Sequence, residues 1–345
     1  MAYTTINKSA DHFNTVLYTG NGSTQSITGV GFQPDFTWIK NRGSTDWNWL
    51  QDAVRGATKV IFSNTSNAES TQAQGLTSFN SDGFTVGTDT GNNGNGNNIV
   101  SWNWKAGTTS GISGGTITPT GYSINATSGF GIYKYAGNGT SGATIAHGLG
   151  KVPTMIIVKR LDSTPEWQIY HTGMGNGKWI ELTTGAQQTG TSRWNDTSPT
   201  NTLFYLGNDS DVNYNGGTYV AYVFCNVPGY SKMGSYIGNG SADGTFIYTG
   251  FKPTFILTKK SSGSGTGWGI FDNKREGAHA GNPTKAVLTP NTNGAEFNTD
   301  RIDVLSNGFK WRYDWNFVNN SGNTYIYMAF GQTLVGSNNT PATAR

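Results

Sequence analysis

A chain of 345 residues is long enough for two or three domains, and a formal net charge of +3 is too small to indicate binding to nucleic acid or to a membrane surface. Cys225 is the single cysteine, which excludes an intrachain disulfide and therefore a small secreted scaffold held by disulfides. The 49 glycines favour turns over helices, while 11 Trp, 16 Tyr and 17 Phe suit half-buried strands. This composition predicts an all-β protein.

The first twenty residues lack the apolar segment of a signal peptide, and no long apolar run occurs elsewhere. We therefore expect a soluble chain that is made in the cytoplasm of its host and has no membrane insertion. Release by lysis would still allow it to act outside the cell.

A Tyr-x-Gly-Asn-Gly-Ser/Thr phrase occurs three times, beginning at Tyr18, Tyr135 and Tyr236, and marks three diverged copies of one module. We expect the phrase to form a turn between strands, because no helix follows it to make a phosphate-binding loop. In each copy an apolar strand led by proline and closed by lysine comes next. These strands cover residues 34–40, 153–159 and 253–259.

The closing lysines are Lys40, Lys159 and Lys259, and we expect each to lift its charge into water while its stem covers apolar surface. A tryptophan then enters a short strand at residues 49–52, 167–170 and 268–271, and a lysine-led strand follows it. Asp82-Gly83 and Asn307-Gly308 have the composition of tight hairpin turns.

The last strand of each copy is predicted at residues 99–104, 219–224 and 325–330. Successive side chains of a strand point to opposite faces, so one face is apolar in all three copies and is predicted to be core. The opposite face has Ser101 and Asn103 in the first copy but Ala221 and Val223 in the second. We expect a neighbouring module or subunit to cover this second face in copies two and three.

The predicted organisation is an N-terminal segment with module 1 over 1–107, a Gly/Ser/Thr-rich connector over 108–130, module 2 over 131–230, module 3 over 231–335 and a tail over 336–345. The connector is expected to be flexible or extended. The fold class is all-β, with three tandem small antiparallel β-sandwich modules of jelly-roll-like type.

Several of the repeated phrases together resemble a repeat domain of structural proteins from marine tailed bacteriophages that infect cyanobacteria and other abundant marine bacteria. They include Phe32-Gln-Pro-Asp-Phe-Thr-Trp-Ile-Lys-Asn-Arg42, Ser101-Trp-Asn-Trp-Lys-Ala-Gly107 and Gly229-Tyr-Ser-Lys-Met-Gly-Ser-Tyr236. The resemblance covers nearly the whole chain. It implies a component of the virion exterior, of the kind labelled tail fibre or structural protein, and it brings no catalytic residues with it.

No catalytic group, cofactor site or metal site is predicted. His12, His147, His171 and His279 are scattered, and a zinc site needs three or four converging ligands. The acid pairs Asp209/Asp211 and Asp300/Asp303 do not recur across the copies, so we interpret them as turn and cap residues. Asn- and Asp-rich loops at 89–95 and 208–213 do not match a calcium-binding loop.

Exposed aromatic side chains are the candidate binding residues. Trp311, Tyr313 and Trp315 alternate, which predicts one shared face on a strand over 309–317. Sugars stack on such rings, although a core or a subunit interface would also use them. Trp47 and Trp49 in the first copy have the same two interpretations.

The leading hypothesis is a non-enzymatic structural protein on the exterior of a phage virion, as a tail fibre or tail appendage that takes part in host attachment. The alternatives are a capsid decoration or head-fibre protein, and a protein that binds or degrades carbohydrate. The expected partners are other virion proteins, further copies of the chain in a homo-oligomer, with a trimer as the natural assembly, and a glycan of the host surface. Nucleic acid is not an expected partner.

Overall fold

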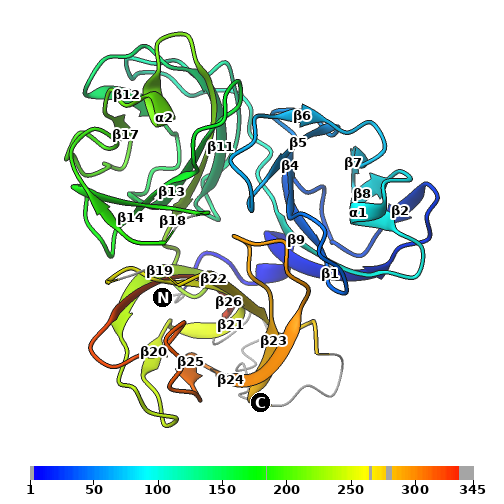
Figure 1. The fold of residues 1–345 in the computed structure, drawn as a ribbon. Helices are drawn as coiled ribbons and strands as arrows, with labels where there is room; N and C mark the ends of the chain where they lie inside the picture. Colours follow the sequence, from blue (N-terminus) through cyan, green and yellow to red (C-terminus); the bar gives the residue numbers. More distant parts are fainter. Residues whose placement is uncertain (1–3, 184, 264–265, 277–281, 334–345) are drawn as a thin grey trace.

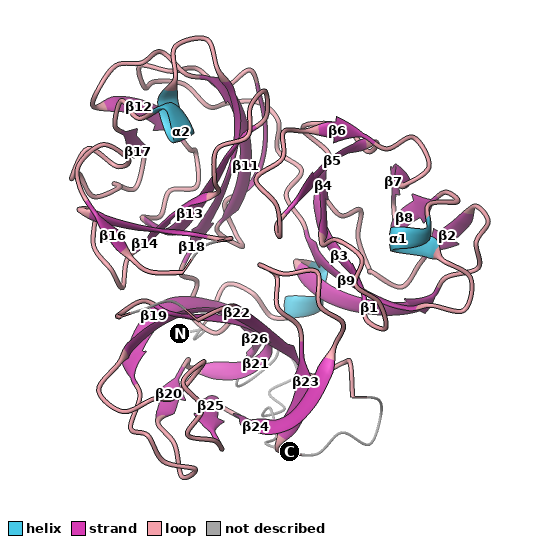
Figure 2. Cartoon of the chain, viewed as in Figure 1, coloured by secondary structure: helices cyan, strands magenta, loops and turns pink. Residues whose placement is uncertain are grey.

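The computed structural model describes residues 4–183, 185–263, 266–276 and 282–333, and nearly all of their regular structure is antiparallel strand (Figures 1 and 2). The two α-helices of these residues, α1 (Thr90–Asn93) and α2 (Ser210–Asn213), are single turns. A 3-10 turn, η1 (Ser9–Asp11), precedes the first strand. The predicted all-β fold of sandwich modules is confirmed. The predicted tail over 336–345 lies outside the described residues.

Three modules lie as three lobes around a common centre (Figure 1). The strands of module 1 are β1 (Phe13–Thr19), β2 (Gln25–Ile27), β3 (Phe36–Asn41), β4 (Trp49–Asp52), β5 (Lys59–Phe62), β6 (Ser70–Thr71), β7 (Leu76–Asn80), β8 (Gly83–Val86) and β9 (Asn98–Trp104). Those of module 2 are β10 (Gly121–Asn125), β11 (Phe130–Ala136), β12 (Ala143–Ala146), β13 (Pro153–Arg160), β14 (Gln168–His171), β15 (Lys178–Glu181), β16 (Gln188–Thr189), β17 (Leu203–Leu206) and β18 (Thr218–Cys225). Those of module 3 are β19 (Ser231–Ile237), β20 (Phe246–Tyr248), β21 (Phe251–Lys260), β22 (Trp268–Asp272), β23 (Thr284–Val287), β24 (Phe297–Leu305), β25 (Gly308–Trp311) and β26 (Thr324–Thr333).

Each module has a large sheet with the same strand order. The full orders are β1-β9-β3-β4-β5-β6, β10-β11-β18-β13-β14-β15-β16 and β19-β26-β21-β22. In each, the last strand of the module pairs with its proline-led strand and with the strand that ends in the Tyr-x-Gly-Asn-Gly phrase, which is β1, β11 or β19. A second sheet of two to four strands, the small sheet, covers one face of each large sheet, and these layers are β2-β8-β7, β12-β17 and β20-β25-β24-β23. The repeat found in the sequence is therefore a repeat of topology.

The segment between modules 1 and 2 is part of the module 2 sheet. Strand β10 lies within it and pairs with β11, and an isolated bridge joins Thr108 to Ile124. A second bridge joins Gly115 to Ile145 of the small sheet. The segment that the sequence marks as a flexible or extended connector is thus held by sheet hydrogen bonds at several points.

The Tyr-x-Gly-Asn-Gly phrase forms the predicted turn, and a buried asparagine from the loop before the last strand holds it in place. In module 2, Nδ2 of Asn213 donates to the Thr140 and Gly207 carbonyls at 2.9 and 2.8 Å, and its Oδ1 accepts from the Asn138 N–H. The hydroxyl of Tyr135 donates to the Val212 carbonyl. Asn93 and Asn319 make the corresponding contacts in the other modules. The repeated phrase itself does not contain these asparagines and gave no indication of their role.

The apolar face of the last strands forms one core that all three modules share. Trp104 of module 1 lies 6.3 Å from Phe224 of module 2 and 5.8 Å from Phe330 of module 3, between ring centroids. Phe13 of β1 stacks on the same Phe330 at 5.2 Å. The predicted core face is therefore the face that meets the neighbouring modules.

The opposite face of each last strand lies in the core of its own module. Ala221 and Val223 pack beneath the small sheet of module 2, and Tyr327 and Ala329 do so in module 3. The prediction that a neighbouring module or subunit covers this second face was wrong. The alternation of side chains shows which residues share a face, but it does not show which layer covers that face.

Polar contacts link the modules in a closed ring around the shared core. The Tyr222 hydroxyl of module 2 donates to Oδ2 of Asp52 in module 1 at 2.7 Å. Nε1 of Trp102 in module 1 donates to Oδ2 of Asp272 in module 3 at 2.9 Å. Nε2 of His171 in module 2 lies 3.1 Å from the Tyr327 carbonyl of module 3. Because Asp52, His171 and Asp272 end equivalent strands, the ring has approximate threefold symmetry.

The repeated lysines are buried, which corrects the expectation that they lift their charges into water. Lys40, Lys159 and Lys259 have no exposed surface, and their ammonium groups donate to backbone carbonyls. Nζ of Lys40 reaches the Asp46 carbonyl at 2.6 Å and the Asn293 carbonyl of module 3 at 3.1 Å. Burial lowers the pKa of each of the three lysines to about 8. These lysines close the loops that follow their strands, and Lys40 and Lys159 also join modules, since Lys159 donates to the Ser66 carbonyl of module 1.

His171 makes folding sensitive to acid at the junction of modules 2 and 3. Burial lowers its pKa to about 4 from 6.5, and its Nδ1 accepts the Gly173 N–H, so the folded chain holds the ring neutral. The unfolded chain binds a proton near pH 6.5, and the folded chain does so only near pH 4. Stability is therefore lost as the pH falls from 6.5 to 4, by up to about 3 kcal/mol.

We expect His171→Gln to remove this part of the pH dependence while retaining an amide that donates to the Tyr327 carbonyl. Urea unfolding at several pH values between 7 and 4 gives the free energy of unfolding of both proteins. The comparison uses the difference between them at each pH, because the titration of carboxylates affects both proteins alike. An unchanged difference across this range would show that His171 does not carry the effect.

Candidate functional site

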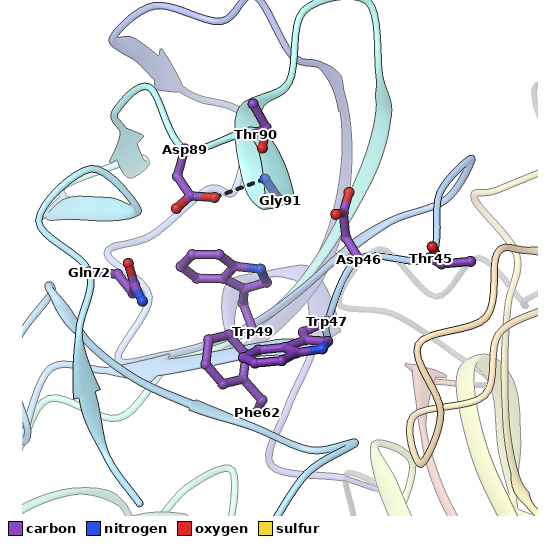
Figure 3. A pocket seen from close by; sticks show the side chains of 9 residues that line it. All are labelled: Thr45, Asp46, Trp47, Trp49, Phe62, Gln72, Asp89, Thr90 and Gly91. Atoms are coloured by element: carbon purple, nitrogen blue, oxygen red, sulfur yellow. Dashed lines mark hydrogen bonds between the residues drawn. The ribbon is translucent and has the colours of Figure 1, made fainter. Parts of the chain in front are cut away.

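A hollow of about 280 Å³ opens on module 1, beside the start of β4 (Figure 3). Two of the predicted aromatic residues, Trp47 and Trp49, line it together with Phe62 at the end of β5. The polar residues come from the loop before β4, which also carries Trp47, and from two further segments, after β6 and at the start of α1. The full lining is Thr45, Asp46, Trp47, Trp49, Phe62, Gln72, Asp89, Thr90 and Gly91.

Trp49 lies in the hollow because it points away from the shared core. It pairs with Ile39 of β3, and the residues with the equivalent pairing in modules 2 and 3 are Gln168 and Gly269. The alignment of Trp49 with Trp167 and Trp268 is therefore wrong by one residue. The sequence contained a signal for this, since Trp49 stands three positions before Asp52. Trp167 and Trp268 stand four positions before His171 and Asp272, the residues equivalent to Asp52.

Asn48 takes the inward position that tryptophan has in the other two modules. Nε1 of Trp167 donates to the Phe62 carbonyl of module 1 at 3.2 Å, and Nε1 of Trp268 donates to the Glu181 carbonyl of module 2 at 3.3 Å. Nδ2 of Asn48 donates to the Thr292 carbonyl of module 3 at 2.7 Å. A one-residue shift moves a side chain to the other face of a strand, so module 1 gains an outward tryptophan.

The aromatic walls of the hollow are held by packing. The rings of Trp47 and Trp49 each meet the Phe62 ring edge-on, with centroids 4.7 and 5.2 Å away. Trp49 is buried, whereas Trp47 is 42% exposed. The result is a fixed ring that remains open to solvent.

The polar rim has carboxylates in set orientations (Figure 3). Oδ1 of Asp89 accepts the Gly91 N–H at 2.8 Å and caps α1. Oδ2 of Asp46 accepts from Nδ2 of Asn41 at 2.7 Å. These contacts bind one oxygen of each carboxylate, and among the described residues the other oxygen has no hydrogen-bond donor.

The second group of predicted aromatics does not form one strand face. β25 ends at Trp311, which is fully buried against Tyr236, Phe271 and Phe309 in the core of module 3. The predicted strand over 309–317 was therefore too long. Trp311 has no access to a ligand, in keeping with the alternative that this face is core.

Tyr313 and Trp315 instead hold the side chain of Arg301 between them. The guanidinium carbon lies 4.2 Å from the centroid of the Tyr313 ring and 4.3 Å from that of Trp315. The Trp315 ring also stacks on Phe317 at 4.3 Å. Tyr313 is exposed, but its inner face is covered by the arginine.

The other candidate side chains of the sequence analysis cap a helix, are buried or bond to the backbone. Asp209 caps α2, which confirms its interpretation as a cap residue, and Cys225 is buried. His147 accepts the Leu149 N–H and contacts the Thr200 carbonyl. His279 lies outside the described residues. Within the described ranges, no three His, Cys, Asp or Glu side chains are grouped to hold a metal ion, and no helix is long and apolar enough to cross a membrane.

Comparison with known proteins gives one match. A family model described as "Domain of unknown function (DUF7483)" matches residues 8–333, a span that includes the strands of all three modules. No curated protein and no solved structure matches the chain.

Proposed function

We propose that this chain, which belongs to the DUF7483 family of unknown function, is a structural protein on the exterior of a bacteriophage particle and serves in a tail fibre or tail appendage during host attachment. The observation that carries the proposal is the single core shared by three modules. A core of this kind joins them into one rigid block, as an exposed appendage needs, while the loops around it are free to vary.

An exposed edge strand supports contacts with other virion proteins or with further copies of the chain. β20 is at the edge of the small sheet of module 3, and its Phe246 and Tyr248 are about half exposed, as is the neighbouring Ile237. Such a strand with apolar side chains is a pairing surface. A homo-oligomer, with a trimer as the natural assembly for a fibre, is part of the proposal, and light scattering of the purified chain measures it.

Mass spectrometry of separated heads and tails tests the location. We expect peptides of this chain in the tail fraction, and antibodies against it should block adsorption of the phage to its host. Peptides in the head fraction alone would favour the alternative of a capsid decoration protein. Their absence from purified particles would overturn the proposal, and turnover of host polysaccharide by the purified chain would favour the carbohydrate-degrading alternative.

A further inference from the structure

We infer that the hollow of module 1 binds one neutral pyranose ring of a surface glycan, with Trp47 as the stacking platform. This inference deepens the proposed role in attachment and rests on it for the source of the glycan. The Trp47 ring is exposed on one side and held edge-on by Phe62, with an angle of 67° between the planes. A flat apolar surface that is fixed before binding loses little conformational entropy when a ligand covers it.

The polar groups of the rim suit hydroxyl groups better than a cation. The rim has the carboxylates of Asp46 and Asp89 as acceptors, but it also has the Trp49 N–H and the Gln72 amide as donors. Each sugar hydroxyl both donates and accepts, so it can use both kinds of group, whereas a guanidinium or ammonium group can use only the acceptors. The mixture therefore favours a polyol over a basic side chain.

Gly91 leaves the Trp49 N–H accessible at this rim. A Cβ atom at position 91 would lie 2.9 Å from Nε1 of Trp49 and 3.1 Å from its Cζ2. In Figure 3 the indole nitrogen faces the space between Gly91 and Asp46. A side chain at position 91 would crowd the tryptophan and close this part of the hollow.

The same place in module 2 is filled by the chain itself. Glu166, Gln168 and Glu181 stand where module 1 has Trp47, Trp49 and Phe62, as the matching strand pairs show. The Arg193 guanidinium bonds to Gln168, pairs with Asp209 and Asp211, and lies 4.8 Å from the Trp179 ring centroid.

In module 3 the place is filled by an aromatic ring. Gly267 and Gly269 are the equivalents of Trp47 and Trp49, and Phe317 packs so closely that a Cβ on Gly269 would be 2.7 Å from it. Among the described residues, the aromatic and open form of this place therefore belongs to module 1.

The size of the hollow limits the ligand to about one ring. Its 280 Å³ lies just below the range of about 300–1,000 Å³ that holds drug-sized ligands. Because Trp47 is exposed at the mouth, the rest of a glycan can continue into solvent. A single ring with few contacts is expected to bind in the millimolar range, and attachment through many copies would strengthen the interaction by avidity.

Titration of the purified chain with methyl glycosides of glucose, galactose and mannose tests the inference, with binding followed by ligand-observed NMR and calorimetry. We expect saturable binding of at least one glycoside. Trp47→Ala should weaken it by about tenfold or more, equivalent to about 1.4 kcal/mol. Gly91→Val should weaken it as well, by closing the hollow from the other side. Tyr313→Ala, which removes an exposed ring from module 3, is the matched control and should leave binding unchanged.

Three outcomes would overturn the inference. They are no binding of any glycoside at tens of millimolar, equal binding by the Trp47→Ala protein, and tighter binding of arginine or choline than of any glycoside. Thermal unfolding of each variant shows whether it is folded. The binding assay uses the isolated chain. If it shows no glycoside binding but mass spectrometry finds the chain in tails, the inference fails and the proposed location stands. If the chain binds a glycoside but is absent from purified particles, the proposed location fails and the sugar-binding inference stands.

Discussion

Replacing Trp104 with alanine should lower the free energy of unfolding by about 3–5 kcal/mol and weaken all three modules together. The indole is fully buried, and its ring contacts Phe36 of its own module as well as rings of modules 2 and 3. The cavity that the substitution leaves would lie at the centre of the shared core, where each module loses packing partners. Urea unfolding should remain one transition by fluorescence and circular dichroism, with its midpoint lowered.

Hydrogen exchange tests whether the effect reaches every module. Peptides that cover β9, β18 and β26 should lose protection to a similar extent in the Trp104→Ala protein. Trp47→Ala removes a ring of the same size that is 42% exposed and contacts Phe62, and it should lower stability by only about 1 kcal/mol. Loss of protection confined to β9, or two separate unfolding transitions, would show that the modules fold independently.

Replacing Arg55 with methionine should destabilise the chain by about 3–5 kcal/mol, because it leaves a buried carboxylate without its partner. Nε of Arg55 bonds to Oδ2 of Asp52 at 2.5 Å, and neither side chain is exposed. The guanidinium also pairs with Glu69 and contacts the Tyr222 hydroxyl of module 2. The measurement is urea unfolding at pH 7.

A matched control separates this effect from the loss of any arginine. Arg160 pairs with Asp162, whose side chain is 41% exposed, and Arg160→Met should lose about 1 kcal/mol or less. Equal losses in the two variants would contradict the importance of the buried position.

The junction of modules 2 and 3 shows that the same interface forms without a buried ion pair. His171 and Met174 stand there in place of Asp52 and Arg55, and His171 bonds to a backbone carbonyl. Gln187 and Met328 take the places of Glu69 and Tyr222. Exchanging the whole set is therefore expected to recover much of the stability that Arg55→Met loses, because no charge is left unpaired. The exchange is Asp52→His, Arg55→Met, Glu69→Gln and Tyr222→Met.

Local features of the structure followed from sequence because they depend on neighbouring residues. The turn at Asp82-Gly83 joins β7 and β8, and the turn at Asn307-Gly308 joins β24 and β25, both as predicted. The last strands lie where alternating apolar residues placed them. The buried lysines were missed because the carbonyls that surround Lys40 come from its own loop and from module 3, and a sequence pattern does not show that such carbonyls converge.

The candidate site could be predicted only in part. Trp47 and Trp49 were identified as exposed-aromatic candidates, and they line the hollow, but the partners Asp89 and Gly91 come from a loop forty residues further along the chain. Trp311 had the same sequence signal and is fully buried. An alternating aromatic pattern is the same for a core face and for a surface face, because the pattern does not show whether another layer packs on that face.

By itself, the sequence determined that this protein is built from three copies of one antiparallel β-module, because turn chemistry and side-chain alternation act over a few residues. Only the tertiary structure decided that the apolar faces of the last strands meet in one common core, since that depends on contacts between Trp104, Phe224 and Phe330, more than a hundred residues apart in the chain. The same long-range packing decided which tryptophans remain open to a ligand.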